Sequence, residues 1–143
     1  MSDPVRILVP TDGSDHSRRA IEHVLDMAAK DSAVEIHLLN VQPPVRGAAA
    51  TMVSQADLEA YHREEGMKVL SKSASAVEAA GITPHLHVGV GNPADIVLDF
   101  ARRLGCRQIV MGTRGLGAVG SLLLGSVARD VAGAAEIPVT LLR

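Results

Sequence analysis

The residues most able to do chemistry lie in a glycine-rich segment near the C-terminus. Five glycines occupy the fifteen positions from Gly112 to Ser126, directly ahead of a predicted helix. Glycine loses much conformational freedom on folding, so such a cluster indicates backbone that needs positive φ or the close approach of another group. Amides that converge in a loop and at a helix N-terminus attract anions. The segment therefore predicts a phosphate-binding site, to which the Ser126 hydroxyl could contribute.

Two general phosphate-binding motifs fit this segment poorly. Gly115 to Gly120 has the GxGxxG spacing of dinucleotide sites, but that motif belongs in a βαβ unit with an acidic residue closing the next strand. Here Glu136 precedes the only strand that follows. Gly120 to Ser126 has Walker-like spacing, but it lacks the lysine that reaches the β- and γ-phosphates. We therefore favour neither a dinucleotide fold nor a hydrolytic P-loop.

A second polar loop, Asp12-Gly13-Ser14, follows the first predicted strand. Taken alone, Asp12 is better explained as a turn residue, because Asp-Gly is a common turn pair. In an open α/β sheet, however, ligands bind beyond the carboxyl ends of the strands where the strand order reverses. The loop after Met111 ends at the same edge, so we interpret Asp12 as part of a ligand site.

The elements that position these loops alternate between strands and helices. Short β-rich runs predict strands at 5–10, 34–41, 82–90, 108–111 and 137–142. Helical spacing and capping residues predict helices from residue 15 onward and at 54–81, 92–105 and 126–135, with a loop at 45–53. Such alternation implies a parallel sheet with helices on both faces. The fold class is an open α/β sandwich.

Composition limits the number of domains and the classes of partner that the chain can have. A chain of 143 residues without a composition break fits one domain, 1–143, and its single Tyr and single Phe require an aliphatic core. The 14 basic residues are scattered and the net charge is -2, so we expect no nucleic-acid partner. No apolar run approaches the ~20 residues that span a bilayer, and no signal peptide is expected. One cysteine, Cys106, excludes an internal disulfide. We expect a cytoplasmic protein without a membrane partner.

The spacing Gly112-x2-Gly115-x9-Gly125-Ser126 resembles the nucleotide-binding signature of the ATP-binding universal stress proteins. Three further segments resemble the same family: 5–14 its opening strand and loop, 89–94 its turn into the third helix, and 137–139 its final strand. The resemblance covers essentially the whole chain and is weakest between Val45 and Val53.

This resemblance implies a five-stranded parallel sheet in the order 3-2-1-4-5, of the adenine nucleotide alpha hydrolase-like, Rossmann-like class. It also implies a homodimer, often formed through the last strand, and ATP with Mg²⁺ between the first loop and the signature loop. Carried over by position, it implies these nucleotide-binding residues: Pro10, Thr11 and Asp12 near the ribose and phosphates; Val41 against adenine; Met111, Gly112, Arg114 and Gly115 along the ribose and phosphate path; Gly125, Ser126 and Val127 at the phosphates.

The leading functional hypothesis is a nucleotide-dependent regulatory module in the stress response, with no catalytic residues assigned. Two alternatives stay open. One is a slow ATPase that uses Asp12 and magnesium, although no residue evidently positions the attacking water. The other is a dimeric interaction protein that binds no nucleotide.

Two histidines outside these loops also deserve a chemical interpretation. His85 and His87 share one face of a predicted strand, where they could bind a metal weakly. Because no third ligand is evident, we interpret this strand as an exposed sheet edge and expect no metal site. Cys106 lies between a helix-ending glycine and a strand, which indicates a structural role.

Overall fold

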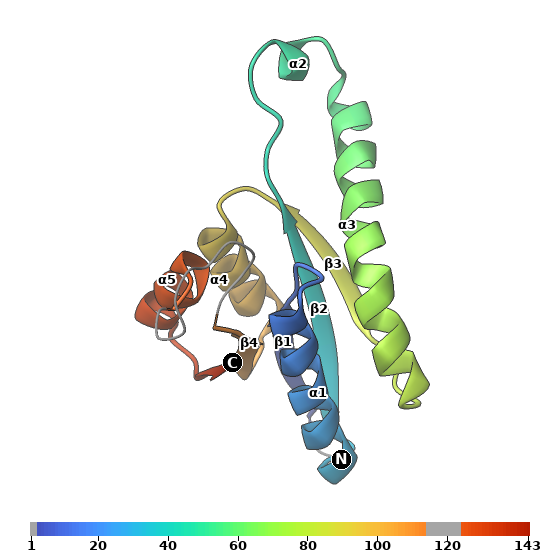
Figure 1. The fold of residues 1–143 in the computed structure, drawn as a ribbon, viewed down its shortest axis with the longest axis vertical. Coiled ribbons are helices and arrows are strands. Elements are labelled where there is room, and N and C mark those ends of the chain that lie inside the picture. The colour runs from blue at the N-terminus through green and yellow to red at the C-terminus, as the bar shows by residue number, and fades with distance from the viewer. Residues whose placement is uncertain (1–2, 114–123) are drawn as a thin grey trace.

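The computed structural model describes residues 3–113 and 124–143, in which strands alternate with helices. The strands are β1 (Val5–Pro10), β2 (Val34–Gln42), β3 (His85–Val90), β4 (Gln108–Gly112) and β5 (Val139–Leu142). The helices are α1 (Asp15–Lys30), α2 (Ala48–Thr51), α3 (Gln55–Ala79), α4 (Pro93–Leu104) and α5 (Ser126–Ala134). Figure 1 shows α2 and the first turns of α3 extending well beyond the sheet.

All strand pairs are parallel, as the β/α alternation predicts, and the sheet order is β3-β2-β1-β4-β5, as the family resemblance implies. Figure 1 shows β1, β2 and β3 side by side. The chain runs outward from β1 to β3 and then returns to the other side of β1 with β4. The strand order therefore reverses between β1 and β4. The loops that leave these two strands diverge at this point and open a crevice at the carboxyl edge of the sheet.

The sheet separates two hydrophobic cores. Ile7 and Val9 pack with α1 and α3 on one face, whereas Leu8, between them, packs with α4 and α5 on the other. Because β1 is buried on both faces, its sequence is a continuous apolar run rather than an alternating pattern. The prediction of helices on both faces is confirmed.

Three differences from the sequence prediction have a local physical cause. The predicted loop at 45–53 contains the one-turn helix α2, which buries no side chain and so leaves no periodic signal. Strand β3 begins at His85 instead of residue 82, because Pro84 has no amide and restricts the residue before it. Strand β5 begins at Val139 instead of residue 137, since Pro138 cannot donate to the ladder, although its carbonyl accepts a bond from the Ile109 amide at 3.0 Å.

The helix ends carry the capping residues expected from the sequence. The Ser14 hydroxyl accepts a bond from the Ser17 amide at the start of α1, and the Asn92 side chain accepts one from the Asp95 amide at the start of α4. Gly105 ends α4 in the left-handed conformation, at φ 67°.

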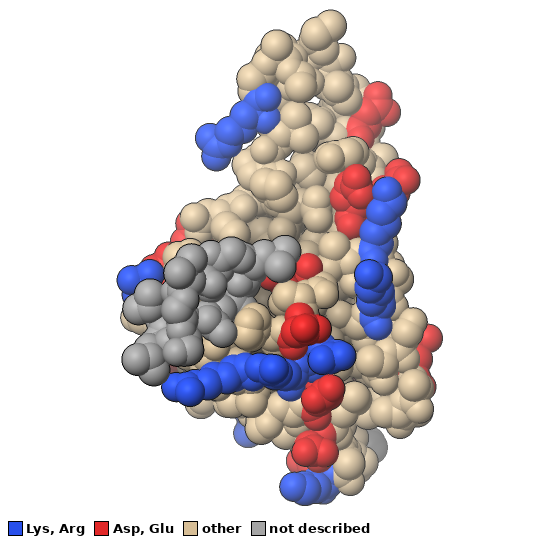
Figure 2. All heavy atoms as spheres, viewed as in Figure 1, with Lys and Arg blue, Asp and Glu red and all other residues tan. Residues whose placement is uncertain are grey.

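On the face shown in Figure 2, basic and acidic side chains lie among one another. Among the described residues, no helix has both the length and the apolar character needed to cross a bilayer.

Candidate functional site

A cavity of about 460 Å³ lies at the crevice between the carboxyl ends of the strands. Its volume is within the range of sites for small organic ligands. The residues that line it come from the ends of β1, β2 and β4 and from the first turns of α1, α4 and α5: Pro10, Thr11, Asp12, Ser17, Leu39, Asn40, Val41, Pro93, Val97, Met111, Gly112, Thr113, Gly125, Ser126, Val127 and Ala128.

Every predicted site residue that the structure describes lines this cavity. Arg114 and Gly115, which the sequence also places in the site, lie outside the described residues. Several lining residues were not predicted from the sequence: Ser17, Leu39, Asn40, Pro93, Val97, Thr113 and Ala128. One of them left a signal in the sequence, because Asn40 is an amide between the apolar residues Leu39 and Val41.

Asp12 is fixed by the first turn of α1. Its Oδ1 accepts hydrogen bonds from the Ser14 amide and from the Ser17 hydroxyl, both at 2.9 Å, while the Ser17 Oγ accepts from the Asp12 amide at 3.1 Å. Partial burial raises the pKa of the Asp12 carboxyl, but the bonds from Ser14 and Ser17 outweigh this effect and hold the pKa below its ordinary value. Asp12 is therefore an ionised carboxylate at neutral pH, held in one orientation.

A buried polar network supports the loop from beneath. The Asn40 Nδ2 donates to the Thr11 carbonyl at 2.9 Å, and the Gln42 Nε2 donates to the Asn40 Oδ1 at 2.6 Å. The Thr11 hydroxyl is within hydrogen-bond distance of the Ser73 hydroxyl, at 3.2 Å, and accepts from the Gly13 amide. Buried polar groups are costly when unpaired, so this network fixes the backbone of residues 11–13 against the end of β2.

Helix α5 begins at the cavity without a side-chain cap. Its N-cap is Gly125, whose amide donates to the Thr113 carbonyl at 2.6 Å, and no acidic residue lies in the first turn. Ser126, which its sequence position also allows as an N-cap, is the first residue of the helix and not its cap. Among the described residues, no side chain accepts from the amides at the start of α5, and these amides carry the positive end of the helix dipole.

The remaining wall is apolar. Leu39 and Val41 from β2, Val97 from α4 and Met111 from β4 line the cavity beside the polar loops. A flat, apolar ring system can pack on such aliphatic groups, while an attached anion can reach the amides of α5. The cavity thus combines an apolar wall, backbone amides that attract an anion, and one fixed carboxylate.

An open parallel sheet with a ligand-sized cavity at its strand-order reversal defines a Rossmann-like α/β protein. The model of the universal stress protein family matches residues 5–143, so the chain belongs to that family. It is 34% identical over 144 residues to universal stress protein MJ0531 of Methanocaldococcus jannaschii. The aligned region covers 96% of this chain and 81% of that protein.

Solved structures share the fold over nearly the whole chain. Superposition on hypothetical protein MJ0577 gives a TM-score of 0.82 at 26% identity and covers 99% of this chain and 96% of that one. A universal stress protein in complex with cAMP gives a TM-score of 0.70, also at 26% identity, and covers 99% of this chain and 98% of that one. The predicted fold class and family are confirmed.

Proposed function

We propose that this chain binds an adenine nucleotide, ATP with Mg²⁺ in particular, in the cavity between β1 and β4, and that nucleotide occupancy makes it a regulatory module in the stress response. The observation that carries the proposal is the start of α5, which lies in the same cavity as the ionised Asp12 carboxylate and whose amides have no side-chain acceptor among residues 3–113 and 124–143. Such amides are a ready site for phosphate.

The base and the phosphates would occupy different walls of the cavity. Adenine would pack on Val41 and the neighbouring aliphatic side chains, with the ribose beside Pro10 and Met111. The phosphates would meet the amides at the start of α5, at Gly125, Ser126 and Val127. Arg114 and Gly115, as residues of the signature, remain proposed phosphate-path residues.

Asp12 explains why a divalent cation belongs in this proposal. A carboxylate beside an anionic phosphate chain is repulsive unless a cation lies between them. Mg²⁺ is commonly bound by one or two carboxylates together with phosphate oxygens. The hydrogen bonds from Ser14 and Ser17 use only one Asp12 oxygen, Oδ1. Oδ2 accepts no hydrogen bond from the described residues and would be the oxygen offered to Mg²⁺.

The comparison with a family member supports the adenine class of ligand. One universal stress protein with the same fold, 26% identical to this chain, is in complex with cAMP. That ligand has an adenine base and a phosphate, the two groups for which the apolar wall and the α5 amides are suited. ATP adds further phosphates that Mg²⁺ and Asp12 would bind.

Regulation requires that the nucleotide change the population of a folded or assembled state. A ligand that binds only the folded chain stabilises it by about 2.7 kcal/mol at 100 times its dissociation constant.

The proposed assembly is a homodimer through β5, whose outer edge has no partner strand among the described residues. We further propose that this dimer acts in the cytoplasm, for which the single reduced cysteine is suited.

The test is the identity of any nucleotide that co-purifies with the protein. The chain is purified without added nucleotide and denatured, and the released small molecules are identified by mass spectrometry. The stripped protein is then melted with ATP, ADP, AMP or cAMP, each with Mg²⁺, and with GTP as the control for the base. We expect adenine nucleotides to raise the Tm and GTP to raise it much less. If no adenine nucleotide is released and none changes the Tm, the proposal is wrong.

A further inference from the structure

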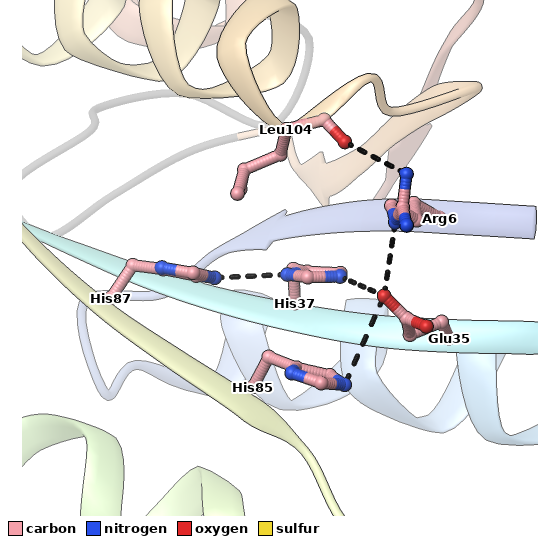
Figure 3. A network of polar contacts seen from close by, with 6 residues as sticks. All are labelled: Arg6, Glu35, His37, His85, His87 and Leu104. Atoms are coloured by element: carbon pink, nitrogen blue, oxygen red, sulfur yellow. Dashed lines mark hydrogen bonds and ion pairs between the residues drawn. The ribbon is translucent and has the colours of Figure 1, made fainter. Parts of the chain in front are cut away.

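A second cluster of polar side chains lies away from the nucleotide cavity, near the opposite ends of β2 and β3. Glu35 and His37 are two residues apart on β2, so their side chains leave the same face of the sheet. In the parallel register, His37 pairs with His85 on β3, which brings a second imidazole to that face. Figure 3 shows both rings directed toward the Glu35 carboxylate.

The donor atoms of these side chains are close together. The His37 Nε2 is 2.7 Å from the Glu35 Oε1, and the His85 Nε2 is 3.8 Å from the same oxygen. One donor atom from each of the three residues lies within 4.8 Å of the others. No third ligand is evident from the sequence beside His85 and His87, because Glu35 and His37 are on β2, about 50 residues earlier in the chain.

The donor set selects a class of cation. Two imidazole nitrogens and one carboxylate oxygen suit Zn²⁺ and neighbouring first-row metals, whereas Mg²⁺ prefers oxygen ligands alone. Tetrahedral bonds of about 2.1 Å place ligand atoms about 3.4 Å apart. The distances from the Glu35 Oε1 to the Nε2 atoms of His37 and His85, 2.7 Å and 3.8 Å, lie on either side of that value. The half-exposed His85 side chain can move closer to the metal position.

His87 completes the arrangement by fixing the orientation of His37. The His37 Nδ1 and the His87 Nε2 are 2.9 Å apart, and the two ring planes are nearly parallel, at 13°. His87 in turn packs against the Phe100 ring of α4, with the centroids 5.6 Å apart. Metal-binding histidines commonly donate their second ring N–H to such a partner. His37 is thereby held with its Nε2 toward Glu35.

We propose that Glu35, His37 and His85 form a binding site for a divalent transition-metal ion of the Zn²⁺ class, with His87 as a positioning residue. The metal takes the place of the proton that the His37 Nε2 now donates to Glu35, and His37 adopts the tautomer with its proton on Nδ1. The Nδ1–H then donates to the His87 Nε2, and the His87 proton moves to its own Nδ1. Because His85 is exposed at the β3 side of the cluster, the fourth metal position is open to water or an added ligand.

A purely structural role for the cluster is the competing explanation. The Arg6 Nε donates to the Glu35 Oε1 at 3.1 Å, and Arg6 also reaches the Leu104 carbonyl at 3.5 Å, so Glu35 joins an ion-pair network (Figure 3). That network accounts for Glu35 and His37. It gives His85 no hydrogen bond: this half-exposed side chain stacks on the His37 ring, with the centroids 4.5 Å apart, and its Nε2 is too far from Glu35. A metal ion would give all three side chains a common polar partner.

The experiment measures zinc binding directly. The full chain, free of affinity tag and nucleotide and treated with a chelator, is titrated with ZnCl₂ by calorimetry, and with MgCl₂ as the hard-cation control. The variants are His85→Ala, which removes an exposed ligand, and Glu35→Gln, which keeps an acceptor for Arg6 and His37. The matched control is His23→Ala, on α1 at the other face of the sheet.

We expect one Zn²⁺ per chain and no Mg²⁺ binding in the wild type. Both cluster variants should weaken zinc binding by at least about tenfold, while the His23→Ala control should leave it unchanged. Circular dichroism checks that each variant is folded, and ATP binding by His85→Ala should equal that of the wild type because the two sites are separate. Absence of zinc binding in the wild type, or equal zinc affinity in His85→Ala and His23→Ala, overturns the proposal.

Discussion

A Cβ placed on Gly112 would lie 2.6 Å from the Cβ of His16 and 3.0 Å from both the carbonyl carbon and the carbonyl oxygen of that residue. Real Cβ atoms essentially never lie 2.6 Å from another heavy atom, and the His16 Cβ is held by the backbone of α1, so only glycine fits at the end of β4. The first turn of α1 therefore packs directly on the strand that leads into the signature loop. This contact sets the distance between the loop that carries Asp12 and the loop that carries the glycines.

Substitution of Gly112 by alanine should consequently destabilise the fold. The clash involves backbone of α1, which cannot rotate away as a side chain would, and we expect a loss of about 1–3 kcal/mol. Urea denaturation measures the change. The control is Gly133→Ala in α5, where a Cβ meets nothing within 4 Å and helix propensity predicts a gain of up to about 1 kcal/mol. Equal stability of the two variants would contradict the packing argument.

Asn40 should matter more to stability than its neighbour Gln42. Replacing the buried Asn40 by leucine leaves the Thr11 carbonyl without its donor and should cost about 1–3 kcal/mol. Gln42→Leu removes only the bond to the Asn40 Oδ1, from a residue that is half-buried, and should cost less than about 1 kcal/mol. Chemical denaturation of the two variants, side by side, provides the measurement. The reverse order would show that Asn40 does not support the loop.

Asp12→Asn separates the role of the cation from that of the loop structure. Asparagine keeps an Oδ1 acceptor for Ser14 and Ser17 but removes the charge. We expect ATP affinity in the presence of Mg²⁺ to fall by at least about tenfold, and affinity in the presence of a chelator to stay equal or rise. Asp57→Asn, at an exposed position in α3, is the control and should change neither value. A fall of the same size with and without Mg²⁺ would contradict a cation bridge.

Cys106 should be nearly unreactive in the native protein. Burial raises the pKa of its thiol to about 11, and only 6% of the residue is exposed. At pH 8 the reactive thiolate is therefore scarce in the folded chain, whereas an unfolded cysteine has a pKa of about 8.5. We expect a thiol reagent to react at least about 100-fold more slowly with the native chain than with the urea-unfolded chain. Comparable rates would show that Cys106 is accessible.

The sequence predicted the sheet well because the signal was local. Each strand is a short β-rich run between turn residues, and the alternation with helices leaves a parallel sheet as the simple solution. The reversal between β1 and β4 then brings the Asp12 loop and the Gly112 loop to one edge. The predicted site residues that the structure describes line one cavity for this reason, although their contacts with a ligand stay a prediction.

Most of the residues that the sequence did not predict depend on contacts between distant elements. Asn40 enters the cavity because β2 ends beside the loop after β1. Glu35 and His37 meet His85 only through the register of β2 with β3. These relations have no fixed spacing in the chain, whereas Ser17 bonds Asp12 locally, across the start of α1. Pattern reasoning therefore found the loops but not the side chains that support them.

The measurement that tests the central claim most directly is MgATP binding by Gly125→Asp. Aspartate is a favourable N-cap and a favourable charge at the start of α5, so the variant should fold with equal or greater stability. Its carboxylate would nevertheless occupy the amides proposed for phosphate, and binding should be lost. Ser54→Asp makes the same change at the N-cap of α3 and should bind like the wild type. If calorimetry shows that Gly125→Asp binds MgATP as tightly as the wild type, the α5 amides do not hold the phosphates and the account is wrong.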